Sequence, residues 1–150
     1  MYPYLILKTI HIMSTAVWFG AGLPIARDVR RTIEQGRPHT DLLVERVTRQ
    51  GRLAAIFGLL TLVSGLCLIF IMGGFGNVRK GIHAGFGLTL LSFAVGLALS
   101  MPTWQKIATS LRQEDGAMDE ARRLSKRFAM FTGIEHLLWV VVLVVMVFRF

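Results

Sequence analysis

Two histidines follow lysines at the same spacing, and each pair opens a long apolar segment. The pattern Lys-x-Ile-His occurs as Lys8 to His11 and again as Lys80 to His83. If both lysines lie at one membrane surface, a rise of ~1.5 Å per residue puts both imidazoles about 4–5 Å deeper. Two neutral imidazoles at one depth on two helices can ligate a haem b between them. The pattern predicts bis-histidine ligation, which favours electron transfer because no coordination position stays open.

Neighbouring residues on the same two helices would complete such a site. Trp18 shares a helix face with His11, and Gly87 leaves space one turn after His83. Two cations adjoin His83 at the membrane surface and suit haem propionates. We therefore expect a haem site, or alternatively a copper site, formed by His11, His83, Trp18, Gly87, Arg79 and Lys80. Taken singly, either histidine would more often donate to a backbone carbonyl or lie among lipid headgroups.

An adjacent acid and base lie within the last apolar segment. Glu135 and His136 follow Arg127 by about 13 Å of helix, which places them near mid-membrane and deeper than His11 and His83. Ionisable residues within a membrane are costly, so we predict a proton relay through this pair, with His136 as the alternative axial ligand in place of His83. A hydrogen bond between helices that only supports the bundle is the structural alternative.

The elements that must position these residues are helices that span a membrane. The chain has 150 residues, of which 53% are hydrophobic, too apolar for an ordinary soluble domain. Four segments are long enough to cross a bilayer, at about 4–26, 53–75, 81–101 and 128–148, and Pro102 is expected to end the third. We predict one all-α domain over residues 1–150, a four-helix transmembrane bundle. The repeated Lys-x-Ile-His pattern further suggests that the bundle is built from two parallel helix-pair repeats.

The distribution of charge predicts the orientation and the partners. Thirteen of the 17 Lys and Arg residues lie in two connecting segments, from Arg27 to Arg52 and from Lys106 to Arg127. This asymmetry follows the positive-inside rule, so both segments are expected in the cytoplasm and both termini outside. The net charge of +8 is thereby explained without a nucleic-acid partner, and the lipid bilayer of a bacterial inner membrane is the expected surrounding. The spacing Gly81-x-x-x-Gly85 permits a homo-oligomer.

The first apolar segment carries a resemblance to known families. The run from Leu7 to Leu23, LKTIHIMSTAVWFGAGL, resembles the first helix of a group of small four-helix membrane proteins. The group includes the copper-resistance D-type domain and the HemJ-type membrane protoporphyrinogen oxidase. The resemblance implies that His11 corresponds to a histidine implicated in haem or metal binding, and that Trp18 and Gly22 occupy packing positions. After Leu23 the chain departs from the oxidase, because it lacks the histidine that follows in that family.

Three functions follow from these patterns. The first is electron transfer through haem b, with a membrane quinone or a redox protein as partner. The second, implied by the resemblance, is an oxidoreductase that oxidises protoporphyrinogen IX, with Arg79 and Lys80 meeting the substrate carboxylates. The third is a transport or accessory subunit for copper or haem.

Overall fold

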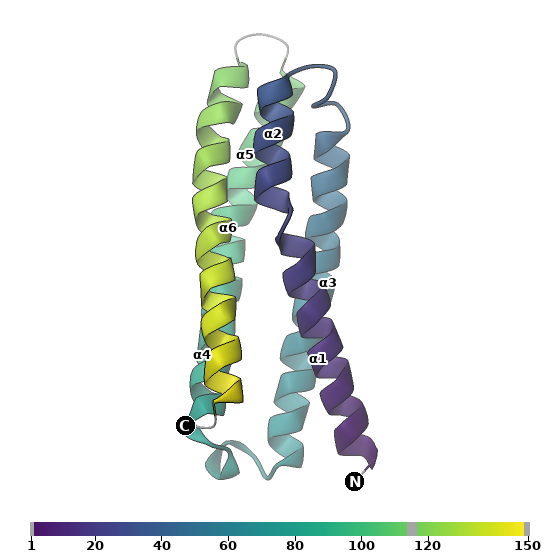
Figure 1. The fold of residues 1–150 in the computed structure, drawn as a ribbon, viewed down its shortest axis with the longest axis vertical. Coiled ribbons are helices and arrows are strands. Elements are labelled where there is room, and N and C mark those ends of the chain that lie inside the picture. The colour runs from purple at the N-terminus through teal and green to yellow at the C-terminus, as the bar shows by residue number, and fades with distance from the viewer. Residues whose placement is uncertain (1, 114–116, 149–150) are drawn as a thin grey trace.

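The computed structural model describes residues 2–113 and 117–148, and within these residues every regular element is helical (Figure 1). Four helical stretches are long and apolar enough to cross a membrane, which confirms the predicted all-α architecture with four spans. The elements are α1 (Tyr2–Gly22), α2 (Ile25–Gln35), α3 (Leu43–Ile71), a 3₁₀ turn (Phe75–Asn77), α4 (Lys80–Val95), a π-helical turn (Gly96–Ser100), α5 (Met101–Arg112) and α6 (Ala117–Val147).

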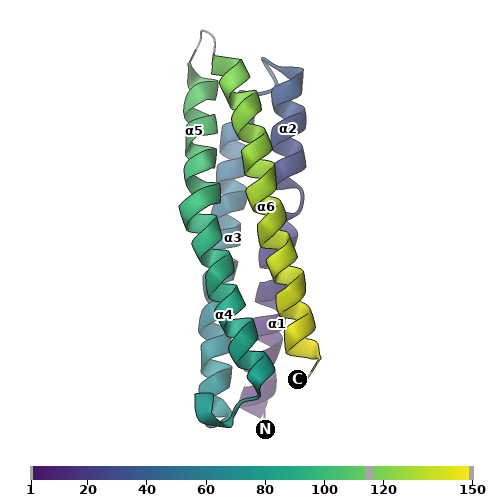
Figure 2. The same ribbon diagram turned by 90° about the vertical axis from the view of Figure 1, so that its left-hand side faces the viewer.

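The two ends of the molecule differ in composition. Both ends of the described chain lie at one end of the bundle with the Phe75–Asn77 turn, which we call the terminal end (Figures 1 and 2). The opposite end, which we call the basic end, holds α2, the start of α3, α5 and the start of α6. It contains the two arginine-rich segments, whereas Lys8, Arg79 and Lys80 belong to the terminal end. Arg149 lies outside the described residues.

The helices associate as two pairs. α1 packs along α3, while α4 and α5 pack along α6 (Figure 2). At the basic end α2 contacts both α6 and α3 and so joins the pairs. The pairing agrees with the expectation of two helix pairs.

The hydrophobic core lies at the basic end rather than between the spans. Its side chains come from α2, α3, α5 and α6 and include the fully buried Val29, Ile33, Leu43 and Ile107. Along the spans, by contrast, many large apolar side chains face outward. Water drives apolar burial where the helices extend beyond the membrane, and lipid gives no comparable drive within it.

The observed boundaries differ from two expectations. The first expected segment, 4–26, divides at Leu23 and Pro24 into α1 and α2, and α2 repeats an apolar residue every four positions at Ile25, Val29 and Ile33. The expectation that Pro102 ends the third helix was wrong, because the helix continues to Arg112. Proline lacks an N–H and its ring crowds the preceding turn; here the wider π-helical turn before it and its place in the first turn of α5 accommodate the ring.

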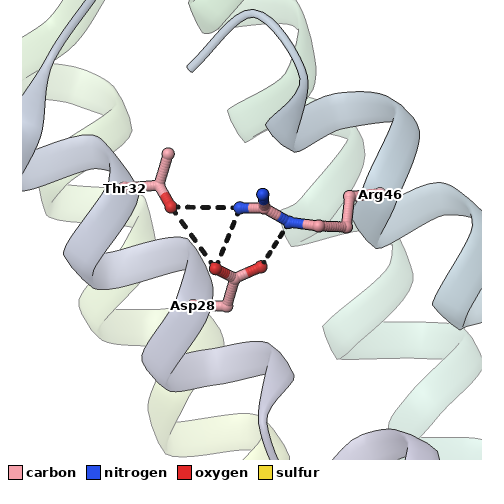
Figure 3. A network of polar contacts seen from close by, with 3 residues as sticks. All are labelled: Asp28, Thr32 and Arg46. Carbon is pink, nitrogen blue, oxygen red and sulfur yellow. Dashed lines mark hydrogen bonds and ion pairs between the residues drawn. The ribbon is translucent and has the colours of Figure 1, made fainter. Parts of the chain in front are cut away.

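A polar network attaches α2 to α3 near the core (Figure 3). Arg46 donates from Nε and Nη2 to the two carboxylate oxygens of Asp28, each at 2.9 Å, and Nη2 also lies 3.3 Å from the Thr32 hydroxyl. This forked geometry fixes the rotation of α2 relative to α3, and thereby directs its apolar stripe into the core.

The position of the core generates a stability prediction. Ile33→Ala is expected to lower the free energy of unfolding by about 2–5 kcal/mol, because Ile33 is 0% exposed and truncation leaves a cavity. Ile56→Ala removes the same atoms from a side chain of α3 that is 62% exposed, and is expected to change stability far less. Thermal unfolding of both variants in one detergent measures the difference, and equal destabilisation would contradict the assignment of the core.

Candidate functional site

A cavity of about 640 Å³ lies between the two helix pairs, toward the basic end. Most of the residues that line it are either aromatic or small. The small residues leave the open volume, and the aromatic rings border it. The polar residues that line it include Ser100 of the π-helical turn and Thr132, Glu135 and His136 of α6. An apolar cavity with a few convergent polar groups is the usual form of a small-molecule site, and the volume falls within the ~300–1,000 Å³ range of such sites.

An aromatic contact borders the cavity on its terminal side. Trp18 of α1 and Phe93 of α4 lie with their ring centroids 4.9 Å apart, and both line the cavity. Both rings pack over Gly58 of α3, where an added Cβ would lie 2.7 Å from Phe93 and 3.2 Å from Trp18. The two helix pairs therefore meet here only because position 58 has no side chain.

The Glu135 carboxylate faces the π-helical turn. The hydroxyl of Ser100 donates a hydrogen bond to Glu135 Oε1, and a Cβ at Gly96 would lie 3.8 Å from each carboxylate oxygen. The turn thus presents a small residue and a donor, four positions apart, to the same acid. Single π-helical turns occur often at functional sites, and a carboxyl group within an apolar cavity is suited to holding or transferring a proton.

His136 presents one ring nitrogen at the cavity wall. Its Nδ1 lies 2.6 Å from the Thr132 carbonyl oxygen, so Nδ1–H donates to that carbonyl and the lone pair of the neutral ring is on Nε2. Nε2 faces Gly22 of α1, where an added Cβ would lie 3.3 Å away. Among the described residues Nε2 has no hydrogen-bond partner. A histidine oriented in this way by a backbone carbonyl is prepared to bind a ligand through Nε2.

Aromatic rings fix His136 from the side. Phe19 of α1 contacts the imidazole edge-on at 5.3 Å and stacks on Trp139 at 3.8 Å. The indole N–H of Trp139 is buried and finds no acceptor in the described part of the chain. The wall formed by α1 and α6 therefore contains an unused donor as well as the unused acceptor of His136.

His11 has a different environment, at the contact between α1 and α3. Its Nδ1 lies 3.0 Å from the Thr61 carbonyl oxygen and 3.1 Å from the Ser64 hydroxyl. The ring packs against Gly65, where a Cβ would approach Cε1 to 3.0 Å. His11 thus donates to a backbone carbonyl and attaches α1 to α3, as expected for a histidine taken singly.

His83 and its neighbours lie at the terminal end. The His83 side chain is exposed and its ring lies 5.7 Å from that of Phe75. Arg79 and Lys80 are also exposed, and nothing lies within 4 Å of a Cβ built on Gly87. None of these four residues lines the cavity.

The structure brings together only part of the predicted site. Trp18, Glu135 and His136 line one cavity, whereas His11 is held in the α1–α3 contact and His83 lies in the open at the terminal end. His136 faces Gly22, which is eleven residues from His11 along α1, about 16 Å of helix, so His11 and His136 are not side by side either.

Sequence reasoning missed Ser100 and Gly96. The spacing Gly96-x-x-x-Ser100, directly before Pro102, was the available signal, because small residues four apart permit close approach of another helix.

Residues 5–150 match a family model described as a predicted integral membrane protein (DUF2269). Searches of curated proteins and of solved structures found no match.

Because the two repeated histidines have different environments, we expect their substitution to have different effects on stability. His11→Ala is expected to lower the free energy of unfolding in detergent by about 1–2 kcal/mol, since it removes a hydrogen bond between helices and empties the space beside Gly65. His83→Ala, at an exposed position, is the matched control and is expected to stay within about 0.5 kcal/mol of the parent protein. A larger loss for His83→Ala than for His11→Ala would show that the two environments are wrongly assigned.

Proposed function

The chain belongs to the DUF2269 family of predicted integral membrane proteins. We propose that the cavity between its helix pairs binds haem b, which His136 would hold through Nε2. The observation that carries the proposal is the orientation of His136. Its Nδ1–H is held by the Thr132 carbonyl, and its Nε2, which has no hydrogen-bond partner among the described residues, lies at the cavity wall where α1 approaches closely at Gly22.

The residues around His136 suit a planar, largely apolar group. The cavity is lined by six aromatic side chains that could stack on or border a macrocycle, namely Trp18, Phe19, Phe93, Trp104, Phe128 and Trp139. Its volume of about 640 Å³ is adequate for a ligand of this class. A second histidine is not required, since one imidazole is sufficient to hold haem iron.

In contrast to bis-histidine ligation, this site takes only one iron ligand, His136, from the protein. Haem, when bound, would supply an iron that carries single electrons. Within the chain, the Thr132 carbonyl fixes the tautomer of His136, and Glu135 with Ser100 offers an acid–base group one residue away. Electron transfer with a membrane quinone or a redox protein, accompanied by proton uptake at Glu135, is the use that this arrangement favours.

Absorption spectra test the proposal directly. The purified protein, as isolated or after addition of haemin, is expected to give a haem spectrum that changes on reduction with dithionite, with near-stoichiometric haem by pyridine haemochrome. His136→Ala should lose this spectrum because it removes the ligand, and Gly22→Val should weaken binding because its side chain would crowd Nε2, which even a Cβ would approach to 3.3 Å. His11→Ala and His83→Ala should retain the spectrum, since neither residue lines the cavity.

Two outcomes would overturn the proposal. One is a parent protein that stays colourless after haemin addition. The other is a His136→Ala variant, folded by size-exclusion chromatography, that keeps the spectrum of the parent.

Oxidation of a porphyrinogen is a second candidate, which the Glu135 carboxyl group favours. A porphyrinogen loses hydrogen as electrons and protons when it becomes a porphyrin, and an acid–base group within an apolar cavity could accept the protons while a quinone accepts the electrons.

This candidate predicts the appearance of porphyrin fluorescence when membranes containing the protein receive a porphyrinogen and a quinone. Glu135→Gln should slow the reaction by about 10²–10⁴-fold, the usual contribution of a general base. Ser100→Ala, which keeps the acid and removes its donor, should slow it less. Fluorescence at the rate of membranes lacking the protein would eliminate this candidate.

A further inference from the structure

A second hollow adjoins the cavity at the basic end. This cleft of about 780 Å³ lies between the start of α3, the α2–α3 connection and the end of α5. Four residues line both the cleft and the cavity, namely Val44, Thr48, Arg52 and Arg112. The two hollows therefore share a border, and the shared border carries two guanidinium groups.

The arginines at this border lack acidic partners. Elsewhere at the basic end Arg30, Arg46, Arg122 and Arg123 each pair with an acid. In the described part of the chain Arg52 and Arg112 form no ion pair, and Asp41 and Glu45, which line the outer cleft, form none with them. Of these four groups only the two arginines also line the cavity between the helix pairs, so its basic-end mouth is positively charged.

Arg52 is the arginine closest in height to His136. The antiparallel contacts of Gly65 with His11 and of Gly58 with Trp18 fix the register of α3 against α1. If the same register continues for one more helical turn, Gly22 of α1 lies level with Ala54 of α3. The Nε2 atom of His136, which faces Gly22, then lies at this height too. Arg52 then lies two residues, about 3 Å of helix, farther toward the basic end. Arg112 lies twelve residues beyond Ser100, about 18 Å, and is too far along to share the same ligand group.

We infer that Arg52 binds a carboxylate of the cavity ligand and thereby selects an acidic amphipathic molecule over a neutral one. The inference rests on the proposed function and names the class of ligand it requires, a porphyrin with free carboxylates. The guanidinium forms forked, charge-assisted hydrogen bonds with a carboxylate, so it suits this role at the edge of an apolar cavity. The ligand is oriented with its acidic end toward the basic end and its centre beside His136.

The choice of Arg52 differs from the expectation that Arg79 and Lys80 bind the propionates. Both of those residues are exposed at the terminal end and outside the cavity. Lys80 opens α4 at the terminal end, thirteen residues or about 20 Å of helix before Phe93, whereas His136 faces Gly22 on the basic-end side of Trp18.

Haemin and haemin dimethyl ester test the inference, because both contain iron and only haemin has free carboxylates. The intact protein in detergent is expected to bind haemin about tenfold more tightly than the ester, the size of one charge-assisted pair. Arg52→Gln should bring the ratio of the two affinities close to one while leaving the affinity for the ester unchanged. Arg52→Lys should retain part of the preference, and Arg30→Gln, an exposed arginine outside both hollows, should retain all of it.

The outcomes separate this inference from the function on which it rests. Equal affinity of the parent protein for haemin and its ester, or an unchanged preference in Arg52→Gln, would overturn the role of Arg52 and leave haem binding in place. Failure of the parent protein to bind either compound would overturn haem binding itself, and the role of Arg52 with it.

Discussion

The structure depends on how two helix pairs come together where lipid gives them little reason to associate. Apolar side chains lose nothing by facing lipid, so helices in a membrane approach each other only where small residues or hydrogen bonds favour contact. Gly58 provides one such place, because Trp18 and Phe93 from opposite pairs both pack over it. The other place is the basic end, where water drives burial of the core and α2 joins both pairs. Between these two attachments α1 also touches α6, where Phe19 and Gly22 meet His136 and Trp139, and the cavity lies beside that contact.

The polar groups of the cavity follow from the same arrangement. An ionisable side chain within the membrane is costly unless a neighbouring helix provides a partner. Ser100 provides it for Glu135, and the π-helical turn brings Ser100 and Gly96 together against that acid. His136 is instead satisfied on one side by its own helix, through the Thr132 carbonyl, which leaves Nε2 to the space near Gly22. The Glu135 carboxylate is therefore hydrogen-bonded to another helical segment, whereas Nε2 of His136 can still accept a hydrogen bond or bind a ligand.

The sequence predicted how far along the bundle each residue lies, but it predicted much less well toward which neighbouring helix a side chain points. Hydropathy and the distribution of arginines predicted the four spans, and the lysine-to-histidine spacing placed His11 and His83 near the same end. That spacing cannot determine toward which neighbour a side chain points, since rotation about the helix axis depends on packing. His11 faces Gly65 and Thr61 of α3, whereas His83 is exposed beside Phe75. The approach of Gly22 to His136, between the first and last helices, leaves no trace in either local sequence.

The order of groups along the cavity has a consequence for how a ligand would enter. From the basic end the cavity presents Arg112, then Arg52, then His136 and Glu135, and beyond them the Trp18–Phe93 contact. A ligand with an acidic end would meet the positive arginines first, and its carboxylate would not have to pass the apolar wall. Desolvating a carboxylate costs more than any single contact returns. The aromatic contact at the other side offers no positive charge to receive it. Exchange at the basic end, the end expected in the cytoplasm, is therefore the route with the lowest electrostatic cost.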